Sequence, residues 1–203
     1  MTAPQQKRSQ TGVVEDFANP PRLFVFVDGV LAPRIFHSLY RRYAESIELK
    51  GDEAILDFGC GSGGIAENLV RRVPNGSVTC VDVSPPMLAV AARRLRRYPN
   101  ARCIVGRIEA LDLSAASFDV VVIHNALHDI PEPERTATVV ELARLLRPGG
   151  HLHFREPTDD KHGLRLGVYR ELMHTAGLLE LRGREEKVFP VGPMFDAVFA
   201  KTE

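Results

Sequence analysis

Short apolar runs alternate with longer amphipathic stretches along this 203-residue chain. From residue 51 onward the runs have the length of buried strands, and the stretches between them carry apolar side chains at helical spacing. Strands are predicted at 54–58, 77–82, 101–105, 118–124, 151–156, 178–184 and 195–201. Helices are predicted at 63–72, 85–97, 133–146 and 164–176. The alternation is typical of an α/β fold.

The order of these elements predicts the sheet. Strands alternating with helices of this length need right-handed crossovers, which place the strands in a parallel sheet covered by helices on both faces. The last two strands are joined by a short link containing Pro190 and Gly192, too short for a crossover. They are expected to form a hairpin, which makes the seventh strand antiparallel to its neighbours.

Three parts of the chain are predicted. Residues 1–18 are polar and are expected to be a disordered tail, and residues 19–50 are expected to be an N-terminal helical cap. Residues 51–203 are expected to form the sheet domain. Within the cap, a helix at 32–49 is predicted from an apolar face that repeats at helical spacing. That face consists of Ile35, Phe36, Leu39, Tyr40, Tyr43 and Ile47.

A glycine-rich segment joins the first predicted strand to the first predicted helix. Gly59, Gly61, Gly63 and Gly64 follow the apolar run at 54–58, and glycine tolerates the positive φ of a tight turn. Bare backbone there lets a cofactor lie beside the free N–H groups of a helix N-terminus. The glycines alone fit both a dinucleotide and S-adenosylmethionine.

Two carboxylates decide between these cofactors. Asp57 stands two residues before the first glycine, where it would repel a pyrophosphate but attract the ammonium group of a methionine moiety. Asp82 ends the next predicted strand, and a carboxylate at that place can accept both hydroxyls of a ribose. The pair favours S-adenosylmethionine.

Three motifs together resemble those of the class I S-adenosylmethionine-dependent methyltransferases of the small-molecule type. They are LDFGCGSG at 56–63, VDVSPPML at 81–88 and RPGG at 147–150. The resemblance covers about residues 51–157. It implies a Rossmann-like seven-stranded sheet in the order 3-2-1-4-5-7-6, with strand 7 antiparallel and helices on both faces. It also implies transfer of a methyl group from S-adenosylmethionine to a small-molecule acceptor.

The resemblance assigns the cofactor site. Asp57 and the glycine turn would hold the methionine part, Asp82 the ribose, and Val83 and Met87 the adenine face. The family commonly has an aspartate that accepts a hydrogen bond from the adenine amino group at the position of Arg107. Arginine is only a donor, so the backbone or Glu109 is expected to accept this hydrogen bond instead. The cofactor-binding candidates are Asp57, Gly59, Cys60, Gly61, Gly63, Asp82, Val83, Met87, Ile108, Glu109 and His124.

The acceptor side is less constrained. Alignment and desolvation can supply most of the rate of methyl transfer, and a general base matters only for an acceptor that loses a proton. His128 and Asp129 are predicted for that role, although a histidine without a function fits the sequence equally well. His124 and His128 also have the spacing of a metal pair, but no third ligand is evident, so no metal site is predicted.

Three further residues are predicted on the substrate side. Glu156 ends the fifth strand, and Tyr40 and Tyr43 belong to the helix at 32–49. The family often builds its lid from residues before the first strand, so this helix is expected either to close the pocket or to pack on the sheet for stability alone. The sequence leaves both readings open.

Composition limits the partners and the cellular location that are expected for this chain. The formal charge is zero, from 26 basic and 26 acidic side chains, so no nucleic-acid partner is expected. Neither a membrane span nor a signal peptide is predicted, and three cysteines at strand or turn positions indicate reduced thiols in a cytoplasmic protein. Two alternatives stay open: a non-catalytic S-adenosylmethionine-binding protein and, disfavoured by Asp57 and the hairpin, a dinucleotide-dependent oxidoreductase.

Overall fold

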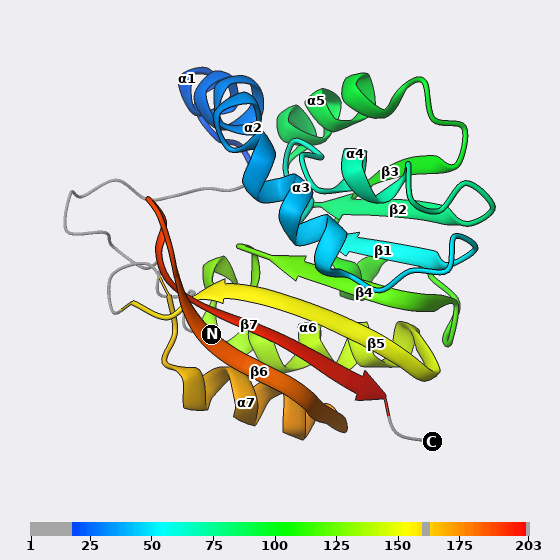
Figure 1. Cartoon of the computed structure of the whole chain (residues 1–203), viewed down its shortest axis with the longest axis vertical. Coiled ribbons are helices and arrows are strands. Elements are labelled where there is room, and N and C mark those ends of the chain that lie inside the picture. Colours follow the sequence, from blue (N-terminus) through cyan, green and yellow to red (C-terminus); the bar gives the residue numbers. More distant parts are fainter. Residues whose placement is uncertain (1–17, 160–162, 202–203) are drawn as a thin grey trace, which may run out of the picture.

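The computed structural model describes residues 18–159 and 163–201 (Figure 1). At its centre lies a seven-stranded sheet with the order β3-β2-β1-β4-β5-β7-β6. The first four strands are those predicted: β1 Ala54–Phe58, β2 Ser77–Asp82, β3 Ala101–Val105 and β4 Phe118–His124. They pair in parallel with one another, and β4 pairs in parallel with β5. The predicted α/β fold and strand order are therefore confirmed.

The last two strands form the predicted hairpin. β6 Leu178–Val188 and β7 Gly192–Lys201 are antiparallel to each other, and β7 is also antiparallel to β5. Because of this hairpin, the ends of both strands near residue 190 lie at the same edge of the sheet as the carboxyl ends of the parallel strands (Figure 1).

β5 begins earlier than predicted. It runs from Leu146 to Pro157, because the chain leaves the preceding helix, α6 Glu132–Leu145, directly in extended conformation and Leu146 pairs with Phe118. The pairing then shifts, so that Val120 faces His151. Gly149, with a φ of 73°, lies in the intervening segment. The glycines at 149–150 were predicted to precede the strand, and they instead form an irregularity within it.

Four helices follow strands of the sheet: α4 Ala66–Leu69, α5 Pro85–Leu95, α6 Glu132–Leu145 and α7 Leu166–Thr175. α5 begins as expected, with the Ser84 hydroxyl accepting from the Met87 N–H at 3.4 Å. α4 is much shorter than the predicted helix at 63–72. It begins later because Gly63 has a left-handed φ of 74°, which does not fit a right-handed helix, and it ends three residues earlier, at Leu69. Short 3₁₀ turns, η2 Ile108–Ala110 and η3 Leu127–Asp129, follow β3 and β4.

The N-terminal region is helical from residue 22. α1 Arg22–Phe26 continues through a π-helical turn, η1 Val27–Leu31, into α2 Ala32–Ile35, and α3 spans His37–Ser46. The single helix predicted at 32–49 is wrong in its continuity, because the backbone breaks at Phe36, where ψ is 14°. The predicted disordered tail lies, apart from Ala18, outside the described residues.

Two hydrophobic cores lie on opposite faces of the sheet. α6 and α7 cover one face, where Leu142 and Tyr169 pack with Leu56 and Phe154. α3, α4 and α5 cover the other face, where their apolar side chains surround Ile55. α3 contributes Tyr43, Ala44 and Ile47 to this second core. The division into a cap at 19–50 and a domain at 51–203 remains a prediction.

None of the helices in the described ranges, 18–159 and 163–201, is long and apolar enough to cross a membrane.

Candidate cofactor and acceptor site

The glycine segment forms a tight turn at the carboxyl end of β1. Gly59, Gly61 and Gly63 have φ values of 65°, 51° and 74°, a region that favours glycine. The Gly59 N–H donates to the Val81 carbonyl at 2.8 Å, which ties the turn to β2. A Cβ at Gly59 would overlap the Cβ of Ala126. The turn is therefore confined between β2 and Ala126, and its backbone favours glycine at positions 59, 61 and 63.

Asp57 lies directly beneath this turn and is buried. Its Oδ2 atom has no hydrogen-bond partner among the described residues. Burial raises the pKa of Asp57 to about 7, and the nearby charge of Asp82 adds to the rise, while a hydrogen bond from the Ala66 N–H opposes it. A buried carboxylate oxygen without a donor is complementary to a cationic N–H group.

Asp82 lies beside the turn at the end of β2. Its Oδ2 accepts from the Gly61 N–H at 2.7 Å, and its Oδ1 accepts from the Ser84 N–H at 2.8 Å. Burial raises the pKa of Asp82, although these N–H groups act in the other direction. Each carboxylate oxygen has two lone pairs, so both retain the capacity to accept a hydroxyl.

The apolar candidates near Asp82 differ in exposure. Val83 is exposed and can contact a ligand, whereas Met87 is buried, with its methyl group 3.7 Å from the position of a Cβ on Gly61. Cys60 is a free thiol whose Sγ lies 3.7 Å from the Gly61 carbonyl oxygen. Met87 and Cys60 therefore pack against the backbone of the glycine turn at Gly61.

The segment after β3 has its side chains engaged elsewhere. Ile108 is fully buried in the core beneath α6. Glu109 accepts a hydrogen bond from the Thr138 hydroxyl, and Arg107 extends to Glu134, with an N–O distance of 2.7 Å. Both Arg107 and Glu109 are thus engaged with side chains of α6. Of the two predicted possibilities for contacting adenine, the backbone and Glu109, the backbone of residues 106–108 is therefore favoured.

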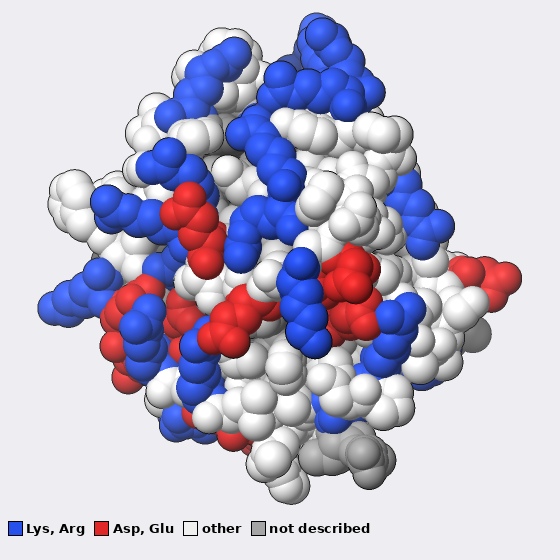
Figure 2. Space-filling view, turned by 45° about the vertical axis from the view of Figure 1, so that its right-hand side comes forward, with Lys and Arg blue, Asp and Glu red and all other residues white. Residues whose placement is uncertain are grey.

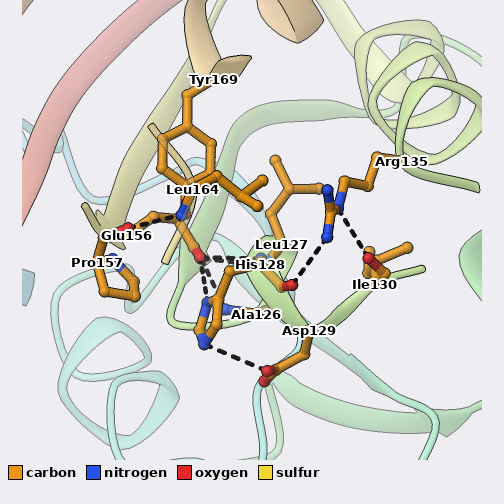
Figure 3. Close-up of polar contacts among 10 residues, drawn as sticks. All are labelled: Ala126, Leu127, His128, Asp129, Ile130, Arg135, Glu156, Pro157, Leu164 and Tyr169. Atoms are coloured by element: carbon orange, nitrogen blue, oxygen red, sulfur yellow. Dashed lines mark hydrogen bonds and ion pairs between the residues drawn. The ribbon is translucent and has the colours of Figure 1, made fainter. Parts of the chain in front are cut away.

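Figure 3 shows the cluster around Glu156. The Glu156 carboxylate has no exposed surface, and it accepts from the N–H groups of Ala126, Leu127 and His128 at 2.7, 3.1 and 3.2 Å. Arg135 donates to the carbonyls of Ile130 and His128 in the same loop. Glu156 thereby holds the loop of residues 126–130, here called the η3 loop, in place. This loop includes Ala126, whose Cβ leaves no room for a side chain at Gly59. Its predicted place on the substrate side does not match this burial.

His128 is held between two carboxylates. Its Nδ1 lies 2.6 Å from Glu156 Oε2, and its Nε2 lies 3.3 Å from Asp129 Oδ1. The structure therefore brings His128 and Asp129 together, as the sequence suggested, but both ring nitrogens already face protein atoms. This arrangement is suited to holding the loop rather than to taking a proton from an acceptor.

A pocket of about 170 Å³ is lined by His124, at the carboxyl end of β4. Its walls come from the N-terminal helices, the carboxyl ends of β4 and β5, and the tip of the β6–β7 hairpin. The lining residues are Ala32, Phe36, Leu39, Tyr40, His124, Asn125, Arg155, Val188, Val191 and Met194. Of the residues predicted for the site, Tyr40 and His124 line this pocket, and Asn125 and Arg155 are polar lining residues that the sequence did not indicate.

His124, which lines the pocket, packs against two tyrosines. Its ring centroid is 5.0 Å from that of Tyr43 and 5.9 Å from that of Tyr40. Burial, together with the charge of Arg155, lowers the pKa of His124 to about 4. The imidazole is therefore neutral near neutral pH. Among the described residues, no group of three or more His, Cys, Asp or Glu side chains could hold a metal ion.

The two tyrosines have different positions. Tyr40 packs on Gly64 of the glycine turn and reaches the pocket. Tyr43 lies deeper, with the Arg155 guanidinium 5.2 Å from its ring centroid, and its hydroxyl oxygen is buried without a hydrogen-bond partner in the described chain. α3 thus lies between the glycine turn and the pocket.

Comparison with known proteins agrees with this geometry. Residues 55–150 match the family model described as a methyltransferase domain. The chain is 35% identical over 119 residues to the phthiotriol/phenolphthiotriol dimycocerosates methyltransferase of Mycobacterium leprae, covering 59% of this chain and 43% of that protein. It is 34% identical over 147 residues to the demethylmenaquinone methyltransferase of Thermus thermophilus, covering 69% and 66% of the two chains.

A third relative is the malonyl-[acyl-carrier protein] O-methyltransferase of Halalkalibacterium halodurans, 34% identical over 134 residues, which are 63% of this chain and 49% of that protein. The chain thus spans about half the length of the first curated relatives it matches.

Solved structures share the fold at low identity. The N-methyltransferase NodS from Bradyrhizobium japonicum, in complex with S-adenosylhomocysteine, superposes with a TM-score of 0.68 at 22% identity, over 84% of this chain and 87% of that one. The [4+2]-cyclase SpnF has a TM-score of 0.70 at 19% identity, over 82% and 81%. The shared fold alone therefore does not define the reaction. The matching domain, the sheet order and the glycine turn with its two carboxylates together show that the chain belongs to the class I S-adenosylmethionine-dependent methyltransferases.

Proposed function

We propose that the protein transfers a methyl group from S-adenosylmethionine to a small-molecule acceptor. The observation that carries this proposal is the buried Oδ2 of Asp57, which lacks a donor and lies beneath the glycine turn. The ammonium group of the methionine moiety fits this oxygen, and the Asp82 carboxylate fits the ribose hydroxyls. When bound, the cofactor would supply an electrophilic methyl group on a sulfonium.

We further propose that the acceptor occupies the pocket lined by Tyr40 and His124. α2 and α3 provide one wall of this pocket. This wall would exclude water from the reacting atoms, as expected if the predicted helix at 32–49 closes the pocket. The neutral imidazole of His124 can accept a hydrogen bond from a hydroxyl or amine of the acceptor and so align it. His128, Asp129 and Glu156 would then act indirectly, by holding the loop that carries Ala126 against Gly59.

The pocket favours an acceptor that is largely apolar. Most of its lining is aliphatic or aromatic, and the charge of Arg155 is offset by Glu186 and by Asp196, with 3.7 Å between Arg155 Nε and Asp196 Oδ2. A strongly anionic acceptor would therefore gain little from Arg155. A hydroxyl or amine on an apolar body matches the lining best.

Replacing Asp82 with alanine tests the cofactor half of the proposal. A carboxylate that holds two ribose hydroxyls contributes charge-assisted hydrogen bonds, so Asp82→Ala should weaken S-adenosylhomocysteine binding at least about tenfold. Isothermal calorimetry measures this affinity, and NAD should give no binding heat with the unaltered protein. Asp119→Ala is the matched control, because Asp119 accepts from Ala54 at the amino end of β1 and should not affect affinity. Unchanged affinity in Asp82→Ala, or binding of NAD alone, would contradict the assignment.

Replacing His124 with phenylalanine tests the acceptor half. The ring packing with Tyr40 and Tyr43 is kept, but the hydrogen-bond acceptor is lost, so methyl transfer should fall at least about tenfold while cofactor affinity changes little. The acceptor is first found by transfer of a radiolabelled methyl group to fractionated metabolites. His153→Phe is the control, since His153 is also buried, with a pKa lowered to about 4 by burial, but lies outside the pocket. Equal losses of activity in both variants would reject the role of His124.

A further inference from the structure

The outer face of the N-terminal helices carries an uncovered apolar stripe. Leu23, Val27, Leu31 and Ile35 are four residues apart, and 73%, 47%, 38% and 70% of their surfaces are exposed. Phe24 and Phe26 are exposed beside them. The opposite face is docked, because Gly29 packs on Met87 and Val90 of α5. A helix that is apolar on both faces is typical of a segment that is covered on both sides.

This stripe is continuous with the mouth of the pocket. Ala32 and Phe36 line the pocket from the same helices, and Val188 and Val191 line it from the hairpin across the mouth. Between those two valines, Phe189 is 91% exposed. The hairpin tip and the N-terminal helices lie at the same edge of the sheet (Figure 1). Apolar side chains thus project from both sides of the opening.

Arginines outnumber acidic residues in the N-terminal helices and in the neighbouring α5, although the chain as a whole is neutral. Residues 22–46 carry Arg22, Arg34, Arg41 and Arg42, against Asp28 and Glu45. α5 and the turn after it, residues 85–97, add four arginines and no acid, and two of these, Arg94 and Arg97, pair with Glu67 of α4. One of these, Arg94, donates to the Gly29 carbonyl and so joins α5 to the N-terminal helices. In Figure 2 the top of the molecule, where α1, α2 and α5 lie in Figure 1, shows Lys and Arg without Asp or Glu.

We propose that the outer face of α1, η1 and α2, together with the hairpin tip at Phe189, docks on an anionic lipid bilayer. Peripheral binding of this kind needs apolar side chains that enter the headgroup boundary and basic side chains that meet anionic headgroups, and this face has both. A second copy of the chain would also bury the stripe, but it would bring two arginine-rich surfaces together. An acidic partner protein would match the arginines but leaves the aliphatic stripe unexplained.

The docked orientation has a consequence for the acceptor. With the stripe and Phe189 in the headgroup boundary, the pocket between them opens toward the bilayer, so an acceptor with a long apolar tail could enter without crossing water. This part rests on the proposed function, whereas the docking itself does not.

Co-sedimentation of the full chain with vesicles tests the docking. The protein should bind vesicles of equal parts phosphatidylglycerol and phosphatidylcholine, bind pure phosphatidylcholine much less, and lose binding as salt rises. The double variant Leu23→Ser/Ile35→Ser should reduce partitioning at least about tenfold. The control is Leu179→Ser/Leu181→Ser, which changes two exposed leucines on the edge strand β6 and should bind as the parent does.

Other results would overturn the docking. These are no sedimentation with anionic vesicles, equal losses in the two double variants, or a dimer that Leu23→Ser/Ile35→Ser converts to a monomer in light scattering. Vesicle binding by a chain lacking residues 2–17, but not by the full chain, would show that the N-terminal segment covers the stripe instead. A thermal shift with S-adenosylhomocysteine, measured on every variant, separates failure of docking from failure of the proposed function.

Discussion

Asp57→Asn is expected to weaken binding of S-adenosylhomocysteine about 100-fold, because it removes a buried charge that would pair with the ligand's ammonium group. Asparagine has nearly the same shape, so the glycine turn above it should be kept. Calorimetry measures the loss. Asp119→Asn is the control, since that carboxylate lies at the amino ends of the strands, where it pairs with Arg147 at 2.5 Å. Asparagine at 57 with parental affinity would exclude Asp57 from the cofactor site.

The same variant should change the pH dependence of stability. In the ligand-free protein, burial and the charge of Asp82 raise the pKa of Asp57 to about 7, whereas the unfolded chain has a carboxyl pKa of about 3.9. The folded state therefore holds this proton more tightly. Its stabilising effect is full below about pH 4 and is lost as the pH rises through about 7. Asp57→Asn has no such titration.

Thermal melts without ligand measure this effect. The melting temperature of Asp57→Asn, relative to the unaltered protein, should be higher at about pH 8 than at about pH 5. An equal difference at the two pH values would show that Asp57 does not titrate in this range. With S-adenosylhomocysteine added at about pH 8, the unaltered protein should melt at a higher temperature than Asp57→Asn, because only the carboxylate gains a cationic partner.

The strands could be predicted because a strand of a parallel sheet that is buried on both faces is a continuous apolar run in the sequence. β1 to β4 are short apolar runs bounded by polar or glycine residues, and their predicted limits agree with the structure. The start of β5 could not be predicted in this way. Leu146 is extended because it pairs with Phe118, a residue distant in sequence, while the local glycines at 149–150 indicate a turn.

The clustering of the cofactor-binding candidates was predictable for a similar reason. The glycines and Asp57 are close in sequence, and the next strand brings Asp82 to the same edge of the sheet. The acceptor half depends on contacts between distant segments. Glu156 was predicted to face a substrate, but its three backbone N–H donors come from the loop after β4.

A signal for Arg155 was present in the strand alternation. Leu152 and Phe154 face α6 and α7, so residue 155 must face the side of α3. There it lies against Tyr43 and lines the pocket. Asn125 carried a second signal, since asparagine directly after a strand is suited to the left-handed backbone that it adopts, with a φ of 53°.

Gly59→Ala is expected to lower the free energy of unfolding by about 3 kcal/mol or more and to abolish cofactor binding. Two costs combine at this position. The φ of 65° is unfavourable for alanine, and the new Cβ would overlap the Cβ of Ala126. Gly177→Ala separates them, because Gly177 has a φ of 74° but no atom within 4 Å of an added Cβ. That control should lose only about 1–2 kcal/mol.

A second substitution tests whether the overlap is the larger cost. Ala126→Gly removes the opposing Cβ, so the double variant Gly59→Ala/Ala126→Gly should recover stability until its loss is close to that of Gly177→Ala. Urea unfolding of the unaltered protein, Gly59→Ala, Ala126→Gly and the double variant gives the coupling free energy as a double-mutant cycle. Recovery of S-adenosylhomocysteine binding in the double variant would show that the η3 loop, which Glu156 holds in place, sets the shape of the glycine turn. Strict additivity of the two substitutions would show that the loop and the turn are independent, and that Glu156 and His128 have no part in shaping the cofactor site.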